Sequence, residues 1–320
     1  IQGGVYLDLV ARSARALVEG GFGFYALGSP TRVMENYMFT DLAKMVVAAR
    51  KNIPYASPLH LFGAGHPLTM PLAVALGCDT FDSASYVLFA RSNRYMTESG
   101  VLSLDSMKHL PCSCQVCMKA SPKSLLELEH AERTRLLSLH NLYVLRAELE
   151  KCKEAISEGR LWDLVEEKSM AHPKLRASFS EVSAVSSLLA EGTPPLKDRG
   201  LFVRGVDDLA RPELIHSAAR LKRAMARRSG SAYLLSTGES PPKEGVQDFY
   251  KLSPVLGPYP AELDFVYPFG QTVVSGKPSP EAMVAAAKAL RAMGYLSVAW
   301  KGSRKVRSRR KRRGASPSPR

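Results

Sequence analysis

The sequence predicts an α/β fold: the carboxyl-terminal half of a (β/α)8 TIM barrel with a metal-binding subdomain, followed by a small α+β domain and a disordered basic tail. Three observations lead to this prediction. Apolar segments that end in glycine or polar residues alternate with helical segments over the first 85 residues, three of the five cysteines lie within residues 112–117, and residues 301–320 hold ten basic residues and no acidic one.

The first 85 residues contain successive βα units, in which hydrophobic strands and amphipathic helices take turns. The predicted elements are a helix over 5–20, a strand over 22–29, a helix to about Arg50, a strand over 59–67, a helix over 71–77 and a strand over 78–83. Residues 2–4, "QGG", have the character of a strand end, so we expect a fourth strand whose body precedes Ile1.

Polar or glycine residues follow the predicted strands, as in "ALGS", "LFGAG" and "FDS". The carboxyl ends of consecutive parallel strands are where a (β/α)8 barrel builds its active site. Four strand ends account for about half of the eight strands in such a barrel. We therefore expect either a fragment of a longer protein or one half of a split enzyme, whose barrel a second polypeptide completes.

The middle of the chain changes to a helical pattern. "SPKS" at 121–124 offers an N-cap serine with proline at the first helical position, and a long amphipathic helix is predicted from Glu129 to about Arg160. "AEGTPPLKDRG" at 190–200 is rich in proline and glycine and predicts a linker. The predicted domains are the partial barrel over 1–190, the α+β domain over 200–298 and the tail over 299–320.

The α+β domain is predicted from a few short patterns. They are a basic helix over 220–230, a strand at "AYLL", a loop over 236–245 and a helix over 279–294.

The net charge of +14 is concentrated at the end of the chain, because the first 300 residues carry only +4. A basic block of this kind repels itself and stays disordered. It is either a solvated or targeting tail or a contact to the phosphates of a nucleic acid. No segment approaches the roughly 20 apolar residues that span a membrane. We expect a cytoplasmic protein with no membrane partner.

The cysteine cluster "LPCSCQVC" predicts a metal site rather than disulfides, because five cysteines in a long chain without a secretion signal suit a reducing compartment. Cys112, Cys114 and Cys117 have the spacing of a zinc knuckle, and His140 is the expected fourth ligand of a structural Zn2+ site. His140 has apolar neighbours one turn away, so a hydrogen-bonded core histidine is the alternative. His130 is nearer in sequence but lies in a polar run.

The combination of "GCDTFDSASY", "LPCSCQVC" and a histidine 23 residues after the last cysteine resembles the tRNA-guanine transglycosylases, the archaeosine type most closely. "QGGVYLDL", "LHLFGAGHP", "EGRLWDLVEEK" and "PVLGPYPAELDFVYPFGQ" occur in the order of that family. The resemblance covers roughly residues 1–300. It implies a glycosyltransferase that exchanges guanine in tRNA for 7-cyano-7-deazaguanine (preQ0) without breaking the RNA backbone.

Asp82 matches the nucleophile of the family on this resemblance. A carboxylate at the end of a strand can attack the ribose anomeric carbon as guanine leaves, which gives a covalent aspartyl-ribosyl intermediate. The incoming base then attacks from the vacated face, and two inversions give net retention. Asp79 is the competing carboxylate, with capping or pairing as its expected role. Without the resemblance the two residues are hard to rank.

The resemblance also implies a binding site for the exchanged base. Gln2 matches a glutamine that reads the guanine edge, and Gly28 and Ser29 supply backbone groups. The family usually has two glycines and an aliphatic residue where this chain has Gly28, Ser29 and Pro30, which puts the affinity for the base in question. Phe62 is expected to stack on the base, with a place in the barrel core as the alternative.

Arg91 and Arg94 are expected to contact the tRNA, with ordinary surface charge as the alternative. His60 and His66 are left as structural residues. The family's second catalytic aspartate belongs to the half barrel that would precede Ile1. The family also suggests a homodimer. The competing hypotheses are a noncatalytic zinc-containing tRNA-binding subunit and, more remotely, an unrelated zinc-knuckle protein that binds nucleic acid.

Overall fold

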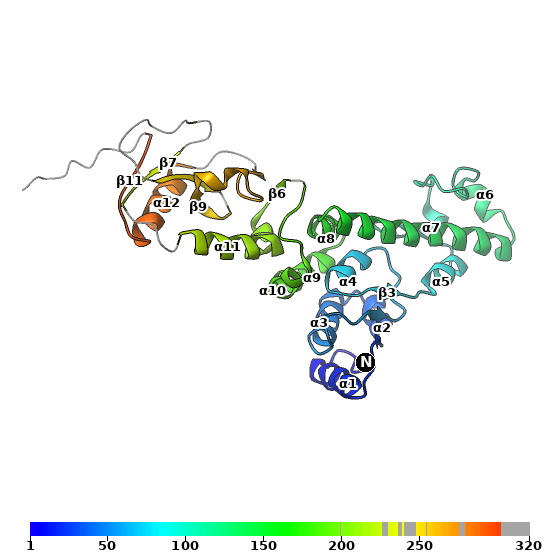
Figure 1. The fold of residues 1–320 in the computed structure, drawn as a ribbon. Coiled ribbons are helices and arrows are strands. Elements are labelled where there is room, and N and C mark those ends of the chain that lie inside the picture. Colours follow the sequence, from blue (N-terminus) through cyan, green and yellow to red (C-terminus); the bar gives the residue numbers. More distant parts are fainter. Residues whose placement is uncertain are drawn as a thin grey trace, which may run out of the picture. The chain divides into compact units, whose positions relative to one another are not determined.

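The computed structural model describes residues 1–198, 200–225, 230–235, 239, 248–253, 255–274 and 279–301. The chain divides into two compact units (Figure 1). The first comprises Ile1–Arg199 and Asp207–Ile215, and the second comprises Gly200–Val206 and His216–Arg320. No helix among the described residues is long and apolar enough to cross a membrane.

The first unit is built on a parallel three-stranded sheet of order β1-β2-β3. Its strands are β1 (Tyr25–Leu27), β2 (Leu59–Leu61) and β3 (Thr80–Phe81). Its first helices are α1 (Leu7–Glu19), α2 (Pro30–Glu35), α3 (Phe39–Arg50) and α4 (Met70–Ala75). The strands and helices fall within the predicted segments, with two exceptions: α4 begins one residue earlier than predicted, and the single helix expected up to Arg50 is two. Tyr37 adopts a φ of 55°, and this left-handed residue breaks the helix between α2 and α3.

The two faces of this sheet differ in exposure. Side chains on one face, such as Leu27, Leu59 and Leu61, pack against the helices and are fully buried. Side chains on the other face alternate with them along the strands. Phe24 is 55% exposed and Phe62 is 49% exposed on that face. The open face therefore carries two large apolar side chains that are about half exposed.

Ile1 lies beside the edge of β1 that β2 does not occupy. Its amino group donates a hydrogen bond to the Ala26 carbonyl at 2.6 Å, and its carbonyl accepts one from the Gly28 amide at 2.9 Å. These two bonds are the pattern of a parallel bridge opposite Leu27. The observation agrees with the prediction that residues 2–4 follow a strand.

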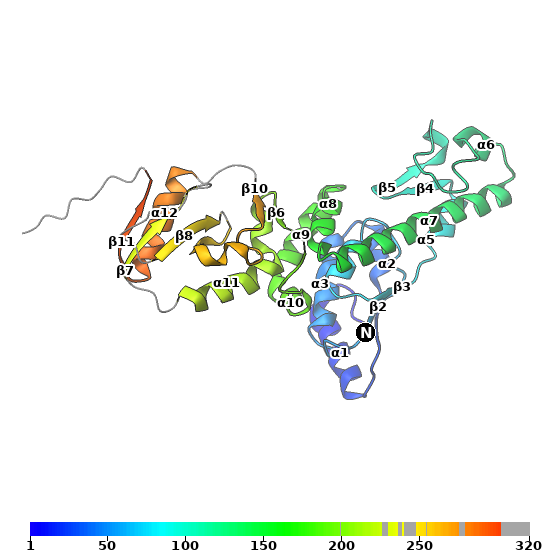
Figure 2. The ribbon, with the colours of Figure 1, turned by 45° about the horizontal axis from the view of Figure 1, so that its top comes forward.

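A cysteine-rich subdomain follows the sheet (Figure 2). It is formed by α5 (Ser85–Arg91), the antiparallel hairpin of β4 (Arg94–Thr97) and β5 (Gly100–Ser103), η1 (Leu104–Ser106), α6 (Pro122–Leu126) and α7 (His130–Ser157). The predicted N-cap is confirmed, because the Ser121 hydroxyl accepts a bond from the Ser124 amide in a capping box. The long predicted helix is α7. Sequence reasoning did not find α5 or the hairpin.

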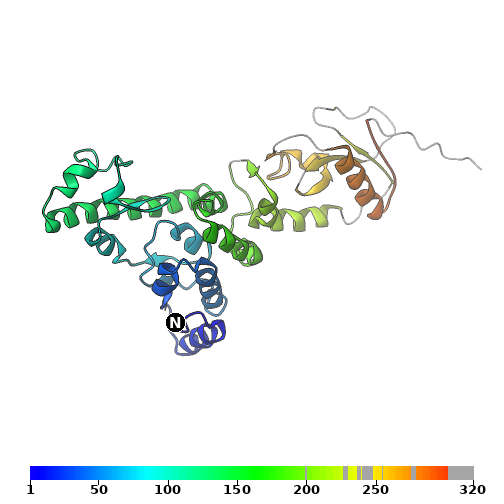
Figure 3. The same ribbon diagram turned by 180° about the vertical axis from the view of Figure 1, so that it is seen from behind.

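Three further helices belong to the first unit: α8 (Leu161–Ser169), α9 (Pro173–Ala184) and α10 (Ser186–Gly192). α9 lies against α3, as Figures 1 and 3 show. The segment predicted as a linker is not detached from this unit. The Lys197 ammonium, 7% exposed, donates to the Gly159 carbonyl at 2.7 Å. Arg211, fully buried, donates to Asp163 at 2.9 Å and to Asp208 at 2.7 Å, which fixes residues 207–215 on α8.

The second unit contains two small sheets. One pairs β6 (Leu201–Val203) with β10 (Thr272–Val274) in parallel. The other has the order β11-β7-β8-β9, with β7 (Gly230–Leu234), β8 (Asp248–Ser253), β9 (Gly257–Pro260) and β11 (Tyr295–Trp300). The remaining elements of this unit are η3 (Ala261–Phe265) and α12 (Pro280–Ala292). η2 (Val206–Ala210) belongs to the first unit from Asp207 on, and α11 (Pro212–Met225) belongs to the second unit from His216 on. The core of the larger sheet includes Tyr250 and Leu290, both fully buried.

Three boundaries in this unit differ from the sequence prediction. The helix expected over 220–230 begins at Pro212, and Gly230 already belongs to β7 because the glycine adopts a φ of 104° that a helix does not accept. β11 extends to Trp300, two residues into the predicted tail. Residues 302–320 of that tail, and all of the predicted loop over 236–245 except Glu239, lie outside the described residues.

Candidate active site and metal centre

Asp82 follows β3 directly, at the carboxyl end of the sheet. Its Oδ1 accepts two hydrogen bonds, from the Gly63 amide at 2.7 Å and from His60 Nε2 at 3.0 Å. The side chain is 55% exposed, and Oδ2 receives no hydrogen bond from the described part of the chain. One carboxylate oxygen is therefore held in place, while the other can meet a substrate.

The loops that follow β2 and β3 are joined by further hydrogen bonds. The hydroxyls of Ser83 and Ser85 donate to the Gly65 carbonyl at 3.1 and 2.6 Å. A Cβ atom at Gly65 would lie 2.1 Å from Ser83 Cβ, so only glycine permits this approach. Gly63, with φ of 62°, turns its amide toward Asp82 in a conformation that favours glycine. The "GAG" segment thus fixes the position of Asp82.

His60 was left as a structural residue by the sequence analysis, and the structure brings it to Asp82. Its Nδ1 lies 2.8 Å from Thr80 Oγ1, and its ring makes an edge contact with Phe62 at 4.8 Å between centroids. The alternation of side chains along β2 and β3 was the sequence signal that could have predicted this contact. His60 and Phe62 share the open face of β2, and Thr80 shares that face of β3.

Asp79 and His66 occupy different environments from Asp82. Asp79 Oδ2 accepts the Leu59 amide at 2.7 Å, at the amino-terminal start of β2, which agrees with the expected structural role. His66 lies in the loop after β2, where burial and then the charge of Arg94 lower its pKa to about 4. His66 is therefore neutral at neutral pH.

Gln2, Gly28 and Ser29 lie together at the ends of neighbouring chain segments. The Ser29 hydroxyl donates to Gln2 Oε1 at 3.0 Å, and a Cβ at Gly28 would lie 2.3 Å from Gln2 Nε2. Ser29 has φ of 69°, the left-handed region that favours glycine. Ser29 therefore keeps a conformation that suits the glycine usual in the family. Phe62 lies on the open face, so the described residues do not bury it as core.

Arg91 and Arg94 belong to the first two elements of the cysteine-rich subdomain. Arg91 ends α5 and is exposed. Arg94 begins β4, and its guanidinium lies over the Phe89 ring at 4.4 Å from the centroid. Their predicted contact with tRNA stays a prediction.

The four predicted metal ligands converge. The ligand atoms of Cys112, Cys114, Cys117 and His140 all lie within 4.8 Å of one another. His140 Nδ1 is 3.4 Å from Cys117 Sγ and 3.6 Å from Cys114 Sγ. His130 is not part of this cluster, because its Nε2 contacts the Arg91 carbonyl at 3.2 Å. The cluster could hold a metal ion.

The contacts of His140 favour metal binding through its Nδ1 atom. Its Nε2 donates to the Met96 carbonyl at 2.9 Å, which leaves Nδ1 without a proton and directed toward the thiols. The Tyr95 ring stacks on the imidazole at 3.8 Å, and the Tyr95 hydroxyl lies 3.3 Å from Cys117 Sγ. Burial lowers the pKa of His140 and raises the pKa of Cys117 to about 12. A neutral imidazole and three cysteine sulfurs, which lose their protons and bind as thiolates, are the donors that suit zinc.

The two remaining cysteines belong to no group of possible metal ligands among the described residues. Cys78 and Cys152 are buried, and burial raises the pKa of both thiols, that of Cys152 to about 12. Both therefore have the properties of packing residues, as expected.

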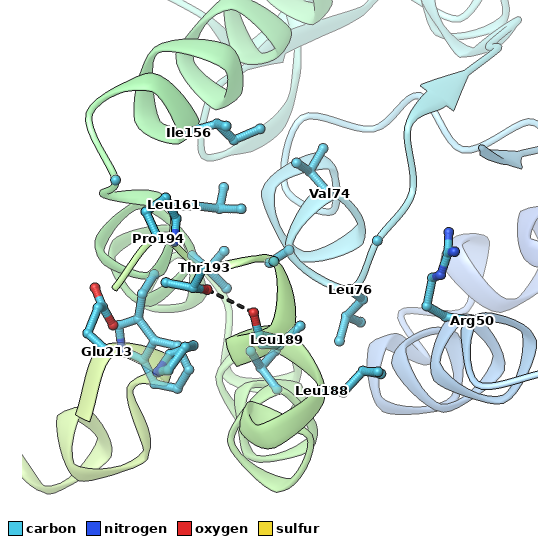
Figure 4. A pocket seen from close by; sticks show the side chains of 18 of the residues that line it. Arg50, Val74, Leu76, Ile156, Leu161, Leu188, Leu189, Thr193, Pro194 and Glu213 are labelled. Atoms are coloured by element: carbon cyan, nitrogen blue, oxygen red, sulfur yellow. Dashed lines mark hydrogen bonds between the residues drawn. The ribbon is translucent and has the colours of Figure 1, made fainter. Parts of the chain in front are cut away.

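A separate cavity of ≈ 330 Å³ lies in the first unit (Figure 4). Gly77 and Asp79, which precede β3, line it, so it lies at the opposite end of the sheet from Asp82. Val74, Leu76 and Leu161 give it an apolar wall. Thr193 closes the end of α10 beside it through a 2.8 Å bond to the Leu189 carbonyl.

Known proteins share this sequence pattern. The sequence model of queuine tRNA-ribosyltransferases matches residues 1–174, which contain the sheet, Asp82 and the metal cluster. The chain belongs to this family. Two curated relatives are named tRNA-guanine(15) transglycosylase. The one from Aeropyrum pernix is 43% identical over 287 residues, and the one from Methanocaldococcus jannaschii is 40% identical over 280.

These relatives extend the similarity beyond the family model into the second unit. The match covers 84% of this chain and 55% of the Aeropyrum relative, and 85% of this chain and 43% of the Methanocaldococcus relative. This member of the queuine tRNA-ribosyltransferase family therefore spans about half the length of the curated relatives it matches.

Proposed function

We propose that this chain is the carboxyl-terminal part of a tRNA-guanine(15) transglycosylase, which exchanges guanine in tRNA for preQ0 through a covalent intermediate on Asp82. The observation that carries the proposal is the carboxylate of Asp82, placed at the end of β3 with Oδ1 held by two donors. A noncatalytic tRNA-binding subunit would have no use for this arrangement.

The proposed reaction uses Asp82 Oδ2 as the nucleophile. Its lone pair forms a bond to the ribose anomeric carbon, and the electron pair of the glycosidic bond leaves with guanine, which takes up a proton from a general acid. Oδ1 becomes the ester carbonyl and keeps both hydrogen bonds. The incoming base then gives up its ring N–H proton to that group, attacks the same carbon from the vacated face and releases the carboxylate, so the configuration is retained.

The exchanged base would occupy the open face beside Asp82. The amide of Gln2 can donate to and accept from the guanine edge. Gly28 and Ser29 would contribute backbone groups, and the half-exposed ring of Phe62 offers a stacking surface. Pro30 has no amide proton to offer, so we expect one backbone bond fewer to the base.

The open face of the sheet supports a barrel that further strands complete. Phe24 and Phe62 expose apolar surface there, and Ile1 makes parallel-type bonds on the free edge of β1. A second half barrel, in the same polypeptide or in a partner, would cover these residues. That half would also supply the general acid/base that the family resemblance implies.

The metal site and the surface arginines complete the proposal. Cys112, Cys114, Cys117 and His140 would hold one structural Zn2+, which would tie the cysteine loop to α7 and the β4-β5 hairpin. Arg91 and Arg94 would contact tRNA phosphates. A tRNA substrate implies a cytoplasmic enzyme, and the homodimer suggested by the family resemblance stays a proposal.

The test combines this chain with the amino-terminal part of the Aeropyrum pernix relative and measures the exchange of labelled guanine into tRNA. Asp82→Asn should reduce exchange by about 10⁴-fold or more, because the nucleophile is lost. Asp79→Asn is the matched control and should retain exchange. Unchanged exchange in Asp82→Asn, with wild-type folding, would contradict the proposal.

A further inference from the structure

His60 connects two side chains of the neighbouring strand. Its register partner on β3 is Thr80, and Asp82 lies two residues farther along on the same face. The imidazole therefore reaches both, with Nδ1 2.8 Å from Thr80 Oγ1 and Nε2 3.0 Å from Asp82 Oδ1. The side chain of His60 is only 16% exposed, which restricts its movement.

The hydrogen-bond partners define one tautomer of His60. An ionised carboxylate only accepts hydrogen bonds, so Nε2 must carry a proton to bond with Asp82. In a neutral imidazole Nδ1 is then an acceptor, and the Thr80 hydroxyl is the group that donates to it. The carboxylate thus selects the Nε2–H form, and the Thr80 hydroxyl supports it by donating to Nδ1.

We propose that His60 is a positioning residue for the nucleophile, with its Nε2 proton fixed by the Asp82 carboxylate and supported by the Thr80 hydroxyl at Nδ1. His60 Nε2 and the Gly63 amide both donate to Oδ1, so rotation of the carboxylate would break two bonds at once. Oδ2 is thereby directed to the substrate. His60 transfers no proton in this role, because Oδ1 stays an acceptor in both the carboxylate and the ester. The inference rests on the proposed function of Asp82.

The tautomer can be measured on the full 320-residue chain without any activity. The chain contains seven histidines, so ¹⁵N-histidine labelling gives few signals, and the signals of His60 are those missing from His60→Gln. We expect the nitrogen chemical shifts of an imidazole that carries a proton on Nε2. Thr80→Val should move the Nδ1 resonance and weaken the preference. A His60 that carries its proton on Nδ1 alone would overturn the inference.

Exchange kinetics in the completed enzyme provide the second readout. His60→Leu removes the donor and should lower kcat by about 10- to 100-fold, the cost of a misplaced reactive group. The KM for tRNA should change by less than about twofold. His60→Gln can still donate to Asp82 and should recover most of kcat. Equal loss in both variants, at equal melting temperature, would contradict a positioning role.

The two proposals fail in different ways. A completed wild-type protein that exchanges no guanine would overturn the proposed function and leave the measured tautomer intact. A His60 without a proton on Nε2 would overturn the inference even in an active enzyme.

Discussion

The group of four possible metal ligands and the Asp82 site differ in how far their side chains are exposed to solvent. His140 is 1% exposed and Cys117 is 8% exposed, and both are held by neighbours such as Met96 and Tyr95. Asp82 is 55% exposed on an open sheet face. The metal cluster is thus complete within this chain, whereas the carboxylate site has donors on one side only. Substitutions among the metal ligands should therefore change the stability of the isolated chain. Substitutions at the Asp82 site should chiefly change the activity of the completed enzyme.

The largest effect on the isolated chain is expected at the metal cluster. Cys114→Ser removes one of four ligands and should reduce zinc affinity by more than about 100-fold, beyond the loss seen when an outer-shell partner is removed. The cysteine-rich subdomain should then lose its fixed structure, because structural zinc contributes folding free energy. Zinc content and thermal unfolding measure both effects. Cys152→Ser is the matched control and should keep its zinc, and a wild-type chain that is fully folded without metal would contradict the role of zinc.

Smaller losses of stability are expected from substitutions on the two faces of β2. Leu61→Ala leaves a cavity in the buried core and should destabilise the isolated chain by about 2–5 kcal/mol. Phe62→Ala, the next residue on the open face, should cost less than about 1 kcal/mol, because its ring has few partners to lose. Denaturant unfolding of both variants makes the comparison. An equal loss of stability would show that the open face is already covered in solution.

The smallest expected effect concerns the arginines near the subdomain. Arg91→Ala and Arg94→Ala should each weaken tRNA binding and reduce the slope of log affinity against log salt by about 0.7 to 1, the effect of one lost phosphate contact. Binding at several salt concentrations measures the slope. Lys123→Ala, an exposed lysine on α6, is the matched control. A slope that stays constant in both arginine variants would leave them as ordinary surface charge.

Sequence reasoning located the cysteines of the possible metal site and the strands of the parallel sheet because each has a local signal. Cysteine spacing marks Cys112, and alternating apolar segments with glycine ends mark β1 and β2, whereas His140 was chosen over a core role on the family resemblance. The break at Tyr37 could not be predicted, because nothing in "NYMF" signals a left-handed residue. The β4-β5 hairpin was missed because "RYMTESGVLS" is short and polar at its turn.

The role of His60 was missed for a different reason. A histidine in an apolar strand is usually a core residue. Its hydrogen bond to Asp82 follows only from the strand register that pairs His60 with Thr80. Gly63 was likewise visible as a turn residue, while its bond to Asp82 depends on two loops that are 19 residues apart. Contacts of this kind follow from strand pairing, which a single sequence specifies poorly.

The central claim is that Asp82 forms the covalent bond to ribose. The most direct measurement is to incubate tRNA with this chain completed by an amino-terminal half barrel, denature the mixture, digest it and locate the modified peptide by mass spectrometry. We predict a ribosyl adduct on Asp82 that Asp82→Asn abolishes and Asp79→Asn retains. An adduct on another residue, or one that persists in Asp82→Asn, would contradict the account.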